Sequence, residues 1–68
     1  MTVQEFREAL SFLGWDQATL WRRLGRTEKQ VSLWANGHSG IPEYAARYLS
    51  DMIEVKRMYH RVFRQEDV

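Results

Sequence analysis

The feature that most constrains this chain is a helix stop followed almost at once by a helix start. Gly25 is placed to end a helix in the left-handed conformation, which glycine adopts at little cost. Two residues later, Thr27 and Gln30 have the spacing of a capping box, in which the threonine hydroxyl accepts from the amide of Gln30 and the glutamine side chain reaches back. Such a short join predicts two helices that meet at a sharp angle.

A second capping box, formed by Thr2 and Glu5, predicts a helix over about residues 3–13 that ends at Gly14. Its apolar residues recur at helical spacing and should form one buried face. These residues are Phe6, Ala9, Leu10 and Leu13.

The two helices at the join are both expected to be short. Asp16 can cap the first of them, and the second should end at Asn36 and Gly37. The apolar residues expected to face inward are Leu20, Leu24, Val31 and Trp34. No segment alternates as a strand would, so the sequence predicts an all-α fold of four to five helices.

A long last helix is predicted after Ile41, with Pro42 in its first turn and no further Gly or Pro to about residue 64. Its front part should pack on the core. The remainder, within a C-terminal helical region of about residues 43–64, leaves an apolar stripe that is best used for dimerisation: Val55, Met58, Tyr59, Val62 and Phe63. The alternative is that the helix bends back near Arg57 and the stripe completes the core.

The composition bounds both size and chemistry. Sixty-eight residues form a single domain over residues 1–68, without cysteine, and His38 and His60 lie too far apart for a local ligand pair. Neither a metal nor another cofactor is therefore expected. No segment resembles a signal peptide or the roughly 18 apolar residues of a membrane span, so the expected location is cytoplasmic, with no membrane partner.

Charge is distributed unevenly, although the formal net charge is only +1. Residues 1–16 carry a net charge of −2, residues 17–47 carry +3, and the rest are balanced. The positive field therefore lies in the middle of the chain, around the predicted helix join, where it favours an anionic partner.

The segment from residue 17 to residue 37 resembles the lambda-repressor-like family of Cro/CI and XRE regulators, which are phage and bacterial repressors. The resemblance covers residues 3 to about 50 and implies a helix-turn-helix over residues 17–36. The matching positions are Gln17, Leu20, Leu24, Gly25, Thr27, Val31, Trp34, Asn36, Gly37, Ile41 and Pro42. Trp21 and Arg26 depart from it, because the family usually has alanine and an apolar turn residue there. These departures predict splayed helices, with Trp21 at the edge of the core; an aromatic contact with DNA is the alternative for Trp21.

Helical geometry places the outward face of the third helix independently of that resemblance. Val31 and Trp34 fix the buried side, so Lys29 and Asn36 lie opposite, flanked by Ser32 and an exposed Leu33. Lysine can donate to guanine, glutamate can accept from cytosine, and leucine can contact a thymine methyl group. The resemblance implies that the base-facing residues are Thr27, Glu28, Lys29, Ser32 and Leu33.

Phosphate contacts are expected from the amides at the starts of the second and third helices and from polar side chains near them. The predicted phosphate-contacting residues are Gln17, Arg22, Arg23, Arg26, Asn36 and His38. For the three arginines, a merely solvated basic surface is the open alternative.

The sequence therefore predicts a transcriptional regulator that binds double-stranded DNA, as a homodimer on an inverted-repeat operator. The resemblance implies a repressor controlled by its own concentration, of the kind used in phage, toxin–antitoxin and anti-CRISPR operons. Nothing suggests an enzyme or a small-molecule ligand, because the chain has no cysteine, no Gly-rich phosphate loop and no Ser-His-acid set. The alternative function is a protein-binding module or inhibitor that keeps the helix-turn-helix fold.

Overall fold

The computed structural model describes the backbone of residues 1–63 and the side chains of residues 1–62. Over this range the chain forms four helices and no strand, so the predicted all-α class is confirmed. The helices are α1 (Val3–Leu13), α2 (Gln17–Leu24), α3 (Glu28–Ala35) and α4 (Glu43–Phe63).

Both predicted capping boxes are present. At the start of α1, the Thr2 hydroxyl accepts from the amide of Glu5 at 3.1 Å, and the Thr2 amide donates to the Glu5 carboxylate at 2.8 Å. The hydrogen bond from the Thr2 amide favours the ionised carboxylate, so it lowers the pKa of Glu5. Gly14 and Gly25 end α1 and α2 with φ of 72° and 68°, in the left-handed region.

The fourth helix is continuous from Glu43 to Phe63, so the predicted alternative of a bend near Arg57 is wrong. Pro42 lies directly before the helix and not within its first turn. Its carbonyl accepts from the amides of Ala45 and Ala46, each at 3.1 Å, and so forms the first hydrogen bonds of α4. Residue 64, the last of the predicted C-terminal region, lies outside the described residues.

The core is formed where α1 packs on α3 and α4 and where α2 packs on α3. Leu13 and Leu24, which were expected inside, are only half-buried and pack against the edge of the core. The fully or nearly buried residues are Phe6, Ala9, Leu10, Leu20, Val31, Trp34, Ala35, Ala45 and Leu49. All four helices therefore contribute to one core.

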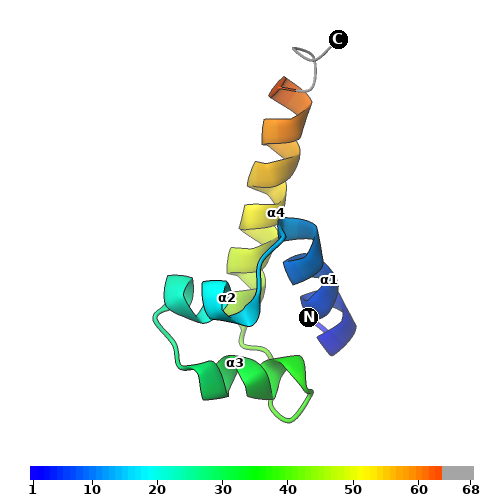
Figure 1. The fold of residues 1–68 in the computed structure, drawn as a ribbon. Coiled ribbons are helices and arrows are strands. Elements are labelled where there is room, and N and C mark those ends of the chain that lie inside the picture. Colours follow the sequence, from blue (N-terminus) through cyan, green and yellow to red (C-terminus); the bar gives the residue numbers. More distant parts are fainter. Residues whose placement is uncertain (64–68) are drawn as a thin grey trace.

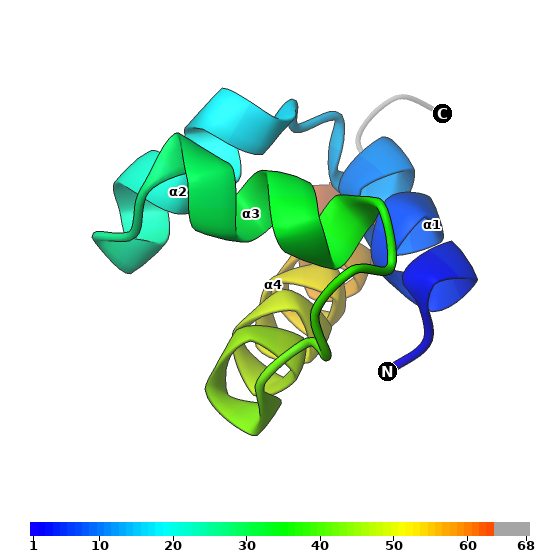
Figure 2. The same ribbon diagram turned by 90° about the horizontal axis from the view of Figure 1, so that it is seen from below.

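The molecule is elongated, with principal extents of 45 × 21 × 17 Å. The N-terminal half of α4 belongs to the globular part, and its C-terminal half projects from it as a rod (Figure 1). Seen from below, α3 lies across the opposite end of the molecule, nearest to the viewer (Figure 2). The third helix and the projecting end of α4 are therefore at opposite ends.

Candidate nucleic-acid interface

The α2–α3 pair presents α3 on a fixed support. Three residues, 25–27, separate the two helices, and the Arg26 amide donates to the Trp21 carbonyl at 2.9 Å. Val31 is fully buried and Trp34 is 5% exposed, so the inner side of α3 is the predicted one. The ring of Trp34 makes an edge contact with the ring of Phe6 in α1, at 6.4 Å between centroids.

Arg7 fixes the far end of α3. Its guanidinium donates from Nε and Nη2 to the carbonyl of Ala35, the last residue of α3, at 3.1 and 2.8 Å. A cation at a helix C-terminus also complements the helix dipole. This contact was not predictable from the sequence, because residues 7 and 35 meet only when α1 packs on α3.

The outer side of α3 carries most of the residues predicted to face bases. Glu28 and Lys29 are exposed and form no ion pair or side-chain hydrogen bond within residues 1–62. The Thr27 hydroxyl already accepts from the Gln30 amide at 3.3 Å, which leaves its proton able to donate. The side-chain Nδ2 of Asn36 donates to the Ser32 hydroxyl at 3.3 Å, so these two side chains are brought together.

Leu33 is not the fully exposed residue that helical geometry predicted; it is half-buried, as is Ser32. The chain leaving α3 folds back on its last turn, where the amides of His38 and Ser39 donate to the Leu33 carbonyl at 2.9 and 3.3 Å. Because this loop lies beside the helix end, Leu33 offers only part of its surface to a partner.

Each of the three arginines at the helix join lies over an aromatic ring. The guanidinium of Arg22 lies 5.3 Å from the Trp21 ring centroid, Arg23 lies 4.6 Å from Trp15, and Arg26 lies 5.0 Å from Tyr44. None of the three is within ion-pair distance of a carboxylate among residues 1–62. Cation–π contact holds these charges in place while leaving their N–H groups exposed.

Tyr44 and Trp15 were not predicted as parts of this site. Neighbouring positions such as 21 and 22 can be paired from the sequence, but residues 26 and 44 meet only in the folded chain. Tyr44 also contacts Trp34 edge-on, at 6.4 Å between centroids, so it joins the first turn of α4 to α3. Trp21 is half-buried against the core, at the edge position that the sequence predicted.

The N-terminus of α2 is already occupied by a carboxylate. Asp16 accepts from the amide and the hydroxyl of Thr19, each at 2.7 Å, and these bonds lower the pKa of Asp16 and keep it ionised. The expectation that amides at this helix start anchor a phosphate is therefore weakened. Gln17 and His38, both predicted phosphate contacts, are exposed and could reach one through their side chains.

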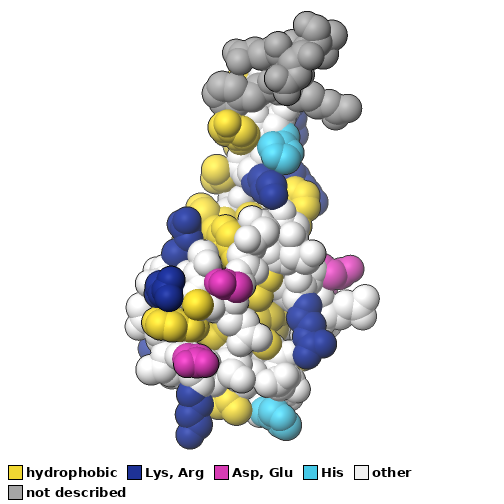
Figure 3. Space-filling model, viewed as in Figure 1, with side chains coloured by type: hydrophobic (Ala, Val, Ile, Leu, Met, Phe, Trp, Pro, Cys, Tyr) yellow, Lys and Arg dark blue, Asp and Glu magenta, His cyan; other side chains and the backbone are white. Residues whose placement is uncertain are grey.

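Basic side chains are spread over the globular part on the face shown in Figure 3, with acidic side chains between them. Arg47 adds a further charge near Tyr44, and it pairs with Glu43 at 3.5 Å with both side chains largely exposed. An exposed pair of this kind contributes little to stability and can be exchanged for another anion.

The predicted stripe on α4 is exposed on the projecting rod. The exposed fractions are 54% for Val55, 52% for Met58, 58% for Tyr59 and 63% for Val62. The Phe63 side chain, also predicted at the interface, lies outside those described.

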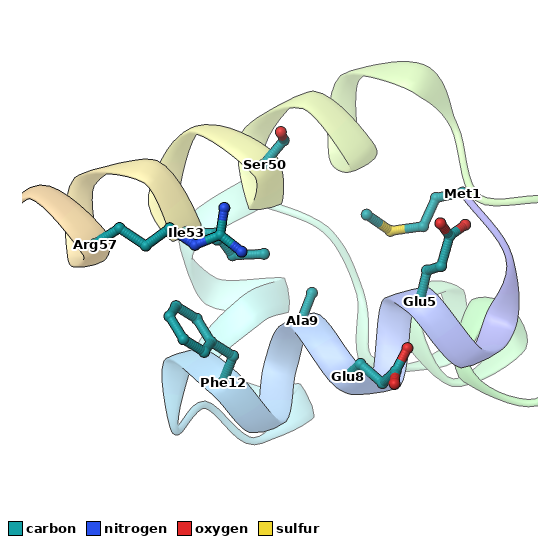
Figure 4. A pocket seen from close by; sticks show the side chains of 8 residues that line it. All are labelled: Met1, Glu5, Glu8, Ala9, Phe12, Ser50, Ile53 and Arg57. Atoms are coloured by element: carbon teal, nitrogen blue, oxygen red, sulfur yellow. The ribbon is translucent and has the colours of Figure 1, made fainter.

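A separate groove of about 320 Å³ lies between α1 and α4, with Phe12 and Ile53 toward one end and Met1 and Glu5 toward the other (Figure 4).

Comparisons with protein-family models, with curated proteins and with solved structures find no match to this chain. Among the described residues, no three His, Cys, Asp or Glu side chains are grouped as metal ligands would be. No described helix combines the length and the apolar character needed to cross a bilayer.

Proposed function

We propose that this chain is a sequence-specific regulator that binds double-stranded DNA through a lambda-repressor-like helix-turn-helix, with α2 and α3 as its two helices. The observation that carries the proposal is the fixed support of α3. Its inner side is buried and its C-terminus is held by Arg7, while Lys29 remains exposed on the outer side. A rigid helix with an outward polar face at one end of a molecule fits the major groove.

In this proposal the first turns of α3 read the bases. Lys29 donates to guanine O6 or N7, and Glu28 accepts from a cytosine amino group. Ser32 and the exposed part of Leu33 extend the contact along the groove, Leu33 against a thymine methyl group. Thr27 donates through its hydroxyl proton.

The phosphate contacts flank this helix. Arg22, Arg23 and Arg26 are positioned by their aromatic partners and are not neutralised by carboxylates among residues 1–62. Binding costs less side-chain conformational entropy when a charged group is already held in place. Gln17, Asn36 and His38 complete the set of proposed phosphate contacts.

We further propose that the protein acts as a homodimer through α4. An isologous pair would present two α3 helices to successive major grooves, about 34 Å apart, on an inverted repeat. Repression of its own promoter remains a prediction that follows from the resemblance.

Two substitutions separate base reading from phosphate contact. Lys29→Ala should lose about 1–3 kcal/mol of discrimination at one base pair of a duplex selected from a random pool. Arg23→Ala should weaken binding to every duplex alike and reduce the salt slope by about 1. Both are measured by titration of labelled duplexes, with Arg61→Ala on the projecting part of α4 as the charge-matched control.

The competing function is a protein-binding module, which the exposed stripe on α4 favours. If Lys29→Ala and Arg23→Ala bind every duplex as the Arg61→Ala control does, the α3 face is not the DNA reader; if the wild-type chain also binds every duplex equally and weakly, the protein-binding function is favoured.

A further inference from the structure

One apolar face of α4 has the regular spacing of a coiled-coil seam. At about 100° per residue, the apolar residues fall within an arc of about 80°. Their spacing of four and three residues is that of alternating d and a positions of a coiled coil. They are Tyr48, Met52, Val55, Tyr59 and Val62, and the last three are called the tip stripe below.

The two halves of this face differ in what covers them. In the globular half, the ring of Trp15 packs on Tyr48 at 6.0 Å between centroids, and Met52 is half-buried. On the projecting rod, the tip stripe is more than half exposed at every position. Only the C-terminal half of the face is therefore open to a second chain.

From these observations we infer that the tip stripe pairs with the tip stripe of a second copy, with the two α4 helices parallel. A fully overlapped antiparallel pair would place the tip stripe of one copy against the half of α4 that Trp15 covers in the other. That arrangement buries little of the exposed surface, whereas parallel helices bring two tip stripes together.

The charges beside the stripe favour the same orientation. Asp51 and Lys56 occupy the g and e positions on opposite flanks, five residues apart, which is the spacing that pairs across a parallel coiled coil. Asp51 is exposed and forms no ion pair among residues 1–62. Lys56 donates one proton to the Phe12 carbonyl and retains two others for a carboxylate of the second copy.

Two orientations remain, a parallel pair and an antiparallel contact of the tips alone. The position of α3 distinguishes them, on the basis of the proposed DNA binding. An antiparallel contact of tips alone would leave Asp51 outside the overlap and would place the two α3 helices at opposite ends of a rod. A parallel pair places both α3 helices at one end, because α3 and the tip stripe lie at opposite ends of each copy (Figure 1). Only this arrangement presents two reading helices to one side of a duplex.

Single cysteines test the orientation directly, because the chain has none of its own. Val62→Cys should form a disulfide-linked dimer at least about tenfold faster than Arg61→Cys, since only facing positions bring Cβ atoms within the roughly 3.5–4.5 Å that a disulfide requires. Arg61 lies on the outer side of the same turn and is the matched control. Circular dichroism verifies that both variants remain helical.

Mixing Val55→Cys with ¹⁵N-labelled Val62→Cys distinguishes the two orientations by mass. Parallel helices give disulfides between identical positions, whereas tip-to-tip antiparallel helices give the mixed 55–62 product. A dominant mixed product, or no cross-link above the Arg61→Cys control, would overturn the inference.

Asp51→Lys should weaken dimerisation several-fold, whereas Glu54→Lys, on the outer side, should not. Equal effects of the two substitutions would show that Asp51 does not pair with Lys56 of the second copy.

These measurements use no DNA, so they are independent of the function proposed above. If identical positions cross-link but the protein binds no duplex in a sequence-specific manner, the parallel pairing stands and the proposed function fails.

Discussion

Gly37 shows at the scale of one residue why the chain leaves α3 as it does. Its φ of 76° lies in the left-handed region, and a Cβ built on it would lie 3.3 Å from Cγ2 of Val3 in α1. The backbone conformation therefore favours glycine at this position, and an added Cβ would also crowd the Val3 side chain of α1.

Alanine at this position should destabilise the fold. Gly37→Ala is expected to lower the free energy of unfolding by about 1–2 kcal/mol, because a side chain is strained in the left-handed region. Gly40→Ala is the matched control in the same loop, since Gly40 has no positive φ and no atom within 4 Å of its added Cβ. Urea unfolding measures both, and equal midpoints for the two variants would contradict this account of the loop.

Local residue chemistry was predictable from the sequence and tertiary contacts were not. The capping pairs Thr2 with Glu5 and Thr27 with Gln30 lie three residues apart, so residue type and spacing sufficed. The half-burial of Leu33 depends on a loop that folds back on α3. The stacking of Arg26 on Tyr44 depends on the packing of α4 beside the helix join.

At the scale of helices, the contact between Arg7 and the end of α3 is the part of the candidate site that most needs testing. Arg7→Gln should lower the free energy of unfolding by about 1–2 kcal/mol, since it removes two charge-assisted hydrogen bonds to the Ala35 carbonyl. For a domain of this size, the melting temperature should fall by roughly 4–16 °C.

The neutral variant Glu8→Gln, at the adjacent exposed position of α1, serves as the control. If thermal melts followed by circular dichroism show the same melting temperature for both variants, Arg7 does not hold α3. If Arg7→Gln is destabilised as expected, loss of duplex binding at a temperature where it remains folded would show that the contact also positions the reading helix.

The helix bounds followed from the sequence because stop and start signals are local. Gly14, Gly25 and the capping residues fixed three helices to within a residue or so. The course of α4 could not be predicted from the sequence, because the same apolar spacing suits a straight rod or a helix that bends back onto the core. Continuous hydrogen bonding from Glu43 to Phe63 decided it.

At the scale of the whole molecule, the two candidate binding surfaces lie at opposite ends (Figure 1). The α3 end presents polar residues on a supported helix, and the α4 tip presents an apolar stripe. In the proposed function, one chain would recognise one half-site through α3, and the α4 tip would join two chains so that two half-sites are recognised. The candidate residues were predictable, but their separation to opposite ends was visible only in the folded chain.

The central claim is sequence-specific DNA binding, and titration of the wild-type chain against two duplexes tests it most directly. One duplex is selected from a random pool, and the other has the same composition in scrambled order. The selected duplex should bind at least about 10³-fold more tightly, and its affinity should fall steeply as salt rises because phosphate contacts release counterions. Equal, weak affinity for both duplexes at moderate salt would contradict the claim.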